Sequence, residues 1–421
     1  MRVGCEIKYL KNGLNTPLHS NTAYNHIIMT APNPTTPEST PAREFEAWED
    51  IPDLNPQLMR GIYGYGFEKP SPIQQKSILS IIDGRDVIAQ AQSGSGKTGA
   101  FATGALNRVR LDVKQPQALI IAPTRELAKQ IHDVVKDLAA QMVGLNVQLL
   151  IGGTSTEDDV ADLKANGPQV IIGCPGRVHD ILRRQPAIGR GMQLLVLDEA
   201  DEMLSAGFNE QIYNIFQQLN ASVQVCLFSA TMPPELHTLS DKFMRNPVRI
   251  LVKSEMLTLE GISQFHVALE TDHDKYATLK DLFTRISVSQ CIIYCNSIRR
   301  VSDLAEAMTN DGFPVCCIHS GMEKDVRDKA YKDFRSGQHR VLISSNVTAR
   351  GIDIQQVSTV INFDMPRDVH TYLHRIGRSG RWGRKGSGVN FVTRRDFRKL
   401  KEIESYYGTT IPELPANFGL A

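Results

Sequence analysis

The 421-residue sequence lacks three features that would place it in a special class of protein. Its seven cysteines show no paired CxxC spacing, which argues against a disulfide framework or a zinc site. No apolar stretch approaches the length of a membrane span, and the N-terminus lacks the basic region and apolar core of a secretory signal. Charge is balanced, with 47 basic and 46 acidic residues, so a polyanion must be bound by a local arrangement of cations. These absences favour a reduced, intracellular globular protein, and its length predicts two domains.

Residues 1–44 differ in composition from the rest of the chain. The segment Ala31–Pro41 is rich in Pro and Thr and has no apolar period. Such a segment buries too little surface to offset its chain entropy, so we expect the tail to be disordered. Met29 lies in this tail, and one hypothesis is that translation begins there, with residues 1–28 as an extension.

A glycine-rich loop, Ala91–Thr98, follows the apolar run Asp86–Gln90 and precedes an Ala-rich helical stretch. This strand, loop and helix order is the context of a phosphate loop, in which backbone N–H groups and a helix N-terminus hold an anion. Lys97 is expected to reach the β and γ phosphates of a nucleoside triphosphate, and the Thr98 hydroxyl to bind Mg²⁺. A flexible Gly/Ser linker is the alternative. The candidate nucleotide-binding residues of this loop are Ser93, Gly94, Ser95, Gly96, Lys97 and Thr98.

Three further apolar runs, 118–122, 146–151 and 169–174, alternate with helical segments and predict a parallel sheet covered by helices on both faces. The loops after these runs gather at the carboxyl edge of the sheet. They combine small residues, a hydroxyl and arginines, which suits a sugar–phosphate backbone. Ordinary strand-to-helix turns are the alternative for each loop taken singly. The candidate residues for contacts to a nucleic-acid backbone are Pro123, Thr124 and Arg125, then Gly152 and Gly153, then Pro175, Gly176 and Arg177.

An acidic pair follows the apolar run 193–197, and hydroxyl residues follow the run 223–228. Asp198 is expected to hold Mg²⁺ and Glu199 to polarise the attacking water, whereas a helix-capping acidic cluster is the alternative. Ser229 and Thr231 are expected to hydrogen-bond to the acidic loop, which includes Asp201, and to couple it to whatever approaches the site.

Gln74 and Phe67 precede the phosphate loop. An amide carries the donor and acceptor that the edge of an adenine needs, while Phe67 would stack on the base. A capping Gln and a core Phe form the alternative, which the residues alone favour.

Taken together, the segments GFEKPSPIQQ, AQSGSGKT, PTREL, GG, PGR, DEAD and SAT occur in that order, and the chain resembles a DEAD-box RNA helicase. VLDEADEML, SATMP and ILVKSEMLTLEGI further resemble the initiation factor 4A subfamily, including its exon-junction relative. The resemblance extends from about residue 45 to the C-terminus.

The second half has its own alternating series of strand-like runs and no phosphate loop, so it is expected to complete the site. Arg378 and Arg381, in the segment Tyr372–Arg384, suit arginine fingers that stabilise charge on the transferring phosphoryl group, whereas a solvated basic loop is the alternative. The resemblance implies that His374 bridges to the acidic and SAT loops and that Asp353 meets the ribose. It also carries over Arg327 and Ser345 as RNA contacts.

Four positions depart from the family pattern. Cys174 replaces a Thr, Asn346 an Asp, Lys324 a Gln, and Trp382 a Phe or Tyr. All groups expected for nucleotide chemistry are retained, so these changes bear on RNA binding and on coupling between the halves.

The sequence predicts an α/β protein with two tandem RecA-like domains, each a parallel sheet flanked by helices. The expected limits are a tail at 1–44, a first domain at 45–251, a linker at 252–262 and a second domain at 263–421. The expected activity is RNA-stimulated ATP hydrolysis with Mg²⁺ and local unwinding of duplexes. The alternatives are a DNA-acting remodeller and an exon-junction-type RNA clamp of low turnover. The expected partners are single-stranded RNA and a translation-initiation scaffold protein. The protein is expected to be a monomer and cytoplasmic, or nuclear if it is the exon-junction-type clamp.

Overall fold

The computed structural model describes residues 43–91, 94–205, 207–250, 262–285, 290–346, 357–379 and 386–415. The side chains of Ser205, Arg285 and Lys324 are not described. Several sequence-based expectations lie outside the described residues: those for the tail up to residue 42, Ser93, nearly all of the linker, Asp353, Arg381 and Trp382.

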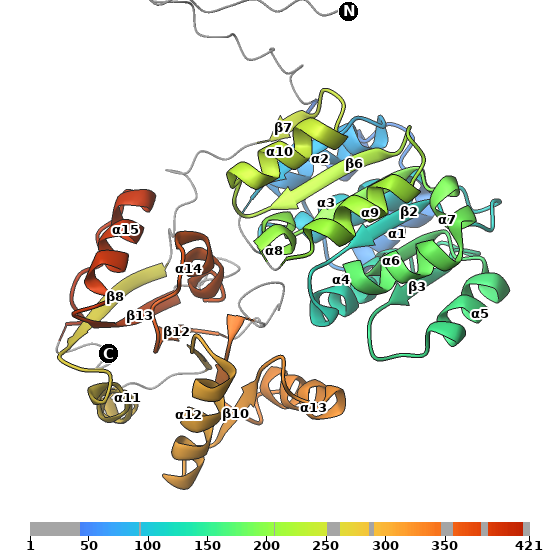
Figure 1. Cartoon of the computed structure of the whole chain (residues 1–421). Helices are drawn as coiled ribbons and strands as arrows, with labels where there is room; N and C mark the ends of the chain where they lie inside the picture. Colours follow the sequence, from blue (N-terminus) through green and yellow to red (C-terminus); the bar gives the residue numbers. More distant parts are fainter. Residues whose placement is uncertain are drawn as a thin grey trace, which may run out of the picture. The chain divides into compact units, whose positions relative to one another are not determined.

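The first half is a seven-stranded parallel sheet flanked by helices (Figure 1). Its strands are β1 (Val87–Gln90), β2 (Ala118–Ile121), β3 (Val147–Leu150), β4 (Val170–Gly173), β5 (Leu194–Asp198), β6 (Gln224–Ser229) and β7 (Val248–Ile250). A 3₁₀ turn (Trp48–Asp50) precedes the helices, which are α1 (Pro56–Gly64), α2 (Pro72–Ile82), α3 (Lys97–Arg108), α4 (Arg125–Leu138), α5 (Thr156–Asn166), α6 (Pro175–Arg184), α7 (Pro186–Gly191), α8 (Ala200–Ser205), α9 (Asn209–Gln218) and α10 (Pro234–Phe243).

The second half is a six-stranded parallel sheet (Figure 1). Its strands are β8 (Ile262–Leu269), β9 (Cys291–Tyr294), β10 (Val315–Ile318), β11 (Val341–Ser344), β12 (Thr359–Asn362) and β13 (Gly386–Thr393). Its helices are α11 (Asp274–Arg285), α12 (Ile298–Asn310), α13 (Lys324–Arg335), α14 (Val369–Ile376) and α15 (Phe397–Tyr407).

The two sheets have the same strand order. The first is arranged β3-β4-β2-β5-β6-β1, with β7 added outside β1, and the second β10-β11-β9-β12-β13-β8. When the strands of each half are numbered along the chain, both orders become 3-4-2-5-6-1. The predicted fold class, two tandem parallel-sheet α/β units of RecA type, is therefore confirmed.

Apolar side chains on both faces of the strands explain why helices cover both faces. In β1, Val87 and Ala89 pack into one core and Ile88 into the other, because successive side chains of a strand point to opposite faces. Every residue of β1, β2, β4, β5 and β6 is buried. This two-sided burial is what the continuous apolar runs predict.

The structure adds details that the pattern did not contain. Strand β7 was not predicted, and β8 begins at Ile262, the last residue of the expected linker. No helix among the described residues is long and apolar enough to cross a membrane.

Candidate active site

The phosphate-loop residues lie between the end of β1 and the start of α3. Gly96 is the N-cap of α3 and has a φ of +98°, a conformation that glycine adopts at low cost. It allows Lys97 to begin the helix with its side chain directed inward and only 6% exposed. Lys97 Nζ donates to Ala91 O at 3.1 Å and to Glu199 Oε1 at 3.3 Å. The two sequence motifs, separated by about 100 residues, thus meet at one point.

The acidic pair lies at the carboxyl end of β5. Asp198 is the last residue of the strand, and its Oδ1 accepts a hydrogen bond from Glu199 N at 3.0 Å. Glu199 has a φ of +49°, which is uncommon for a non-glycine residue and indicates local backbone strain. Burial, followed by the charge of Glu199, raises the pKa of Asp198 to about 7. Burial also acts to raise the pKa of Glu199, but the charges of Lys97, His374 and Arg378 outweigh it and lower that pKa.

Asp201 connects three elements. Its Oδ2 accepts a hydrogen bond from Thr231 Oγ1, and its backbone N–H donates to Ser229 Oγ at 3.4 Å. His374 Nε2, from α14 of the second half, lies 3.0 Å from the same Oδ2. Both side chains are almost completely buried, so the contact is shielded from solvent.

Arg378 lies just beyond α14 and is 2% exposed. Its Nε donates to His374 O at 3.1 Å. Because its charge contributes to the lowered pKa of Glu199, Arg378 brings a cation of the second half to the acidic pair.

The residues at this site fit a nucleotide and a divalent cation. Two buried polar atoms, Ser95 Oγ and Glu199 Oε2, have no hydrogen-bond partner in the described part of the chain. Such atoms are normally satisfied, so a bound phosphate or water is the natural partner. A Thr hydroxyl and a carboxylate, here Thr98 and Asp198, are oxygen ligands of the kind that Mg²⁺ prefers.

Gln74 and Phe67 have structural contacts of their own. Gln74 is 3% exposed, and its Oε1 accepts from Ser71 N at 2.7 Å, which caps α2 as the alternative interpretation expected. Its Nε2 donates to Gly96 O at 3.3 Å and so joins α2 to the phosphate loop. Phe67 is half-buried and stacks on Trp48 with ring centroids 6.3 Å apart.

The three loops after β2, β3 and β4 are linked by arginines. Arg177 Nη1 donates to Thr154 Oγ1 at 2.8 Å and also pairs with Asp159. Arg125 lies against Gly152, where an added Cβ would be 3.1 Å from Arg125 Nη2. Thr124 caps α4 by accepting from Leu127 N at 3.2 Å. Gly153 and Gly176 are exposed at this edge, whereas Pro123 and Pro175 are buried.

Helices α4 and α13 join this edge to the second half. Arg327 Nε lies 2.8 Å from Glu126 Oε1 in a mostly buried ion pair. Lys129 Nζ lies 2.7 Å from Asp328 Oδ2. Ser345, which follows β11, is 9% exposed. Arg327 therefore contacts the first half directly, through a glutamate that the sequence analysis did not single out.

Arg375 is another residue that the sequence analysis missed. It is fully buried, and its guanidinium donates to Asn346 Oδ1 at 2.9 and 2.7 Å. Further acceptors are Asn296 Oδ1, Asn362 Oδ1 and Asp364 O. Burial lowers its pKa to about 10. Two features of the sequence could have pointed to Arg375. Asn346 stands where the family has Asp, and Arg375 directly follows His374.

The sequence of this chain is similar to the sequences of known helicases. Residues 71–239 match the DEAD/DEAH box helicase family, and residues 274–383 match the helicase conserved C-terminal domain. The chain is 52% identical over 368 residues to the ATP-dependent RNA helicase eIF4A of Aspergillus niger, covering 87% of this chain and 92% of that protein. It is 52% identical over 364 residues to the eIF4A of Eremothecium gossypii, covering 86% of this chain and 91% of that protein.

The fold is also similar to solved structures. Saccharomyces cerevisiae Dbp5 bound to RNA and ADP BeF3 has a TM-score of 0.81 and 33% sequence identity, over 88% of this chain and 95% of that chain. The chain belongs to the DEAD-box family and is an ATP-dependent RNA helicase similar to eIF4A.

Proposed function

We propose that this helicase hydrolyses ATP at the Lys97 and Glu199 site when RNA is bound, and that it acts in translation initiation. Two contacts carry the proposal. Lys97 Nζ lies 3.3 Å from Glu199 Oε1, and His374 Nε2 of the second half lies 3.0 Å from Asp201 Oδ2. A site built from both halves makes turnover depend on ligands that favour their contact.

In this proposal the phosphate loop holds the triphosphate. Backbone N–H groups of Gly94 to Thr98 and the N-terminus of α3 face the phosphates, and Lys97 shifts from Glu199 to the β and γ phosphates. Thr98 and Asp198 would hold Mg²⁺, and the ion would supply positive charge that offsets the charge of the phosphates. Phe67 and Gln74 lie near this loop and contact the adenine base. Ser93 and Asp353 complete the nucleotide contacts.

Glu199 is the group that orients and polarises the attacking water. Its second carboxylate oxygen, Oε2, is buried and without a partner among the described residues, so it is available to accept from water. Its lowered pKa keeps it ionised near neutral pH. Arg378 and Arg381 supply positive charge to the transferring phosphoryl group.

RNA binds along the loops after β2, β3 and β4, with Arg327 and Ser345 contributing from the second half. The contacts are to sugar and phosphate, which gives binding without base specificity. Ser229 and Thr231 position Asp201. The contact between Asp201 and His374 then forms only when the second half is close to the nucleotide site. Closure around both ligands bends one strand and separates a short duplex locally.

The place of this chain in translation initiation is supported by the name of its eIF4A relatives. We propose that it works as a cytoplasmic monomer on mRNA and binds a scaffold protein of the initiation machinery. Affinity purification from native extract should recover such a scaffold. Recovery of spliced-mRNA complexes in its place would favour the exon-junction-type clamp.

The decisive experiment is steady-state ATP hydrolysis at fixed low salt. The chain is measured without nucleic acid, with single-stranded RNA and with DNA of matched sequence, and Glu199→Gln serves as the blank. RNA alone should stimulate turnover, and Glu199→Gln should lose about 10²–10⁴-fold in kcat while still binding ATP. Full hydrolysis by this variant would show that the water-polarising group lies elsewhere.

Arg378→Ala tests the contribution of the second half. Because a guanidinium at the phosphoryl group acts mainly in the transition state, kcat should fall on the order of 10³-fold while binding of a fluorescent ATP analogue changes little. Equal loss of binding and turnover would contradict this role. Turnover that ignores RNA, with RNA still bound, would favour the low-turnover clamp, and equal stimulation by DNA would favour a DNA-acting remodeller.

A further inference from the structure

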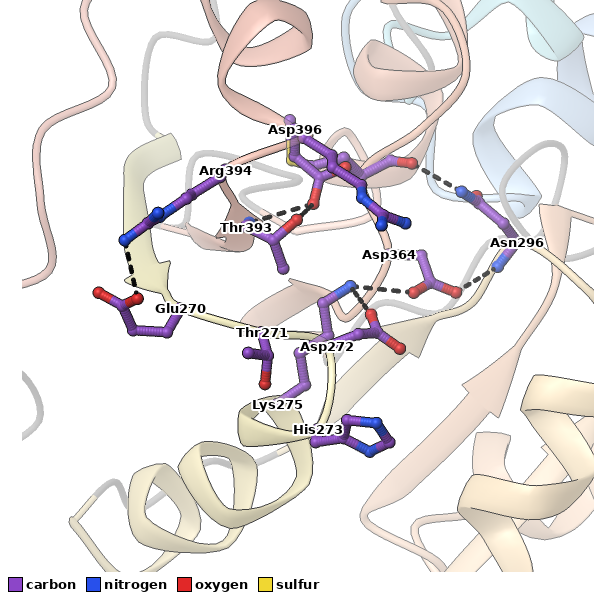
Figure 2. A pocket seen from close by; sticks show the side chains of 12 residues that line it. Glu270, Thr271, Asp272, His273, Lys275, Asn296, Asp364, Thr393, Arg394 and Asp396 are labelled. Carbon is purple, nitrogen blue, oxygen red and sulfur yellow. Dashed lines mark hydrogen bonds and ion pairs between the residues drawn. The ribbon is translucent and has the colours of Figure 1, made fainter.

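An open pocket of about 610 Å³ lies at the carboxyl edge of the second sheet. It is lined by the segments that follow β8, β9, β12 and β13. Figure 2 shows Lys275 at its centre, with dashed contacts to Asp272 and Asp364. None of the roles proposed for the helicase uses this pocket.

The pocket occupies the same topological position as the nucleotide site of the first half. Because the two sheets share one strand order, β8 corresponds to β1, β12 to β5, and β13 to β6. The nucleotide site lies after β1, β5 and β6, and the pocket lies after β8, β12 and β13. The strand pairs end alike: Gln90 is in register with Ser229, and Leu269 with Thr393.

The same chemistry also recurs at both positions. Lys97 is the first residue of α3, and Lys275 is the second residue of α11. Lys97 Nζ lies 3.3 Å from the carboxylate of Glu199, which follows β5. Lys275 Nζ lies 3.2 Å from the carboxylate of Asp364, which follows β12. Both lysines are almost fully buried, at 6% and 3% exposure.

The loops before the two lysines differ. The first loop is rich in glycine and serine, whereas residues 270–273 are Glu, Thr, Asp and His. The Asp272 carboxylate turns back onto the lysine, with Oδ1 at 2.9 Å from Lys275 Nζ. Its Oδ2 accepts from Arg300 Nη1 at 2.6 Å. An acidic side chain of this loop is therefore present where a glycine-rich loop would leave space for a phosphate.

Charge explains why such an anion is needed. Lys275 and Arg300 both lie over the ring of Phe363, at 5.6 and 5.2 Å from its centroid. Two cations this close, one of them buried, require more than the single carboxylate of Asp364. Burial acts to raise the pKa of Asp272, but its hydrogen bonds from Arg300 and Lys275 outweigh it and lower that pKa to about 2. Asp272 is thus held as an anion, although its side chain is 54% exposed.

We infer that this pocket is a second phosphate site that the chain fills from within, with the Asp272 carboxylate in the place of a phosphate group. The inference goes beyond the proposed ATPase. It predicts that the parent chain binds one nucleotide, at the Lys97 site, and that removing the carboxylate of Asp272 creates a site for a small oxyanion such as inorganic phosphate.

The test is thermal unfolding of Asp272→Ala in chloride and in increasing inorganic phosphate at constant ionic strength. The variant should melt lower than the parent in chloride and should regain the lost stability in a saturable manner as phosphate fills the vacated position. Glu270→Ala is the matched control, because it removes an exposed carboxylate of the same loop that pairs with Arg394. All these chains keep the Lys97 site, so any phosphate bound there acts on them equally.

A second variant keeps the inference testable if Asp272→Ala folds poorly. Adding Lys275→Met removes the buried cation and should restore the melting temperature in chloride while abolishing the response to phosphate. A response of Asp272→Ala no larger than that of Glu270→Ala would overturn the inference. So would a second nucleotide bound per parent chain in equilibrium dialysis. Either outcome leaves the proposed ATPase untouched, since that is measured at the Lys97 site.

Discussion

At the scale of single residues, Cys174 shows how a family departure changes local chemistry. It is the N-cap of α6, and its side chain makes no capping hydrogen bond. Thr124, the N-cap of α4, makes that bond to Leu127 N. Burial raises the pKa of the Cys174 thiol to about 12, so the sulfur remains protonated and packs as a small apolar group.

Replacing Cys174 with Thr should therefore stabilise the protein. The hydroxyl would accept from a backbone N–H in the first turn of α6, a gain of about 1 kcal/mol, or about 2–4 °C in Tm. Thermal unfolding followed by circular dichroism measures the change. Cys174→Val is the control, because valine has the shape of threonine without the hydroxyl. An equal gain in both variants would attribute the effect to packing.

At the scale of elements, the unit formed by β1, its loop and α3 depends on one backbone conformation. Gly96 has a φ of +98°, and a Cβ there would lie 2.7 Å from Ser71 Oγ and 3.1 Å from Gln74 Nε2. The loop is therefore held between its own helix and α2. Side chains at this position are excluded both by the backbone and by the neighbouring helix.

Gly96→Ala should cost about 1–2 kcal/mol of stability from the left-handed conformation alone. It should also weaken ATP binding by at least tenfold, since the loop must shift to relieve the contact. Chemical unfolding and titration with a fluorescent ATP analogue measure the two effects. Gly64→Ala is the control: this exposed last residue of α1 has no atom within 4 Å of an added Cβ, and stability should stay equal or rise. Normal ATP affinity in Gly96→Ala would contradict the assigned role of the loop.

At the scale of the whole molecule, the two halves contact each other at two separate places. His374 meets Asp201 near the acidic pair, while Arg327 meets Glu126 near the loops proposed for RNA. Removing one partner of such a contact leaves the other buried and unpaired, which costs free energy. The two contacts are suited to couple nucleotide and RNA binding.

A double-mutant cycle with His374→Ala and Asp201→Asn tests this coupling. Each single variant should lower RNA-stimulated kcat by about tenfold, and the double variant should be little worse than either, because both remove one interaction. Binding of ATP without RNA should be retained. His370→Ala is the control, since His370 lies one turn earlier on α14 and contacts Tyr406. Additive losses would show that the two residues act separately.

The fold class and the main motifs could be predicted from short stretches of the sequence. The fold class could be predicted from the alternation of continuous apolar runs with helical segments. Strands that are buried on both faces are continuously apolar, and the crossovers between parallel strands are helical. The phosphate loop and the acidic pair are contiguous motifs, so their chemistry could be predicted without knowing the fold. Strand β7 was not predicted, because three residues are too few to show a periodic pattern of apolar side chains.

Only the tertiary structure decided which of these groups meet. Lys97 and Glu199 are 102 residues apart, and they meet because parallel strands and crossovers bring their loops to one edge of the first sheet. His374 and Asp201 are 173 residues apart, and their contact joins the two halves. The pocket around Lys275 also left no local signal. Residue types limit the chemistry of a site. The distances between its side chains, their burial and the charges beside them depend on how the whole chain packs.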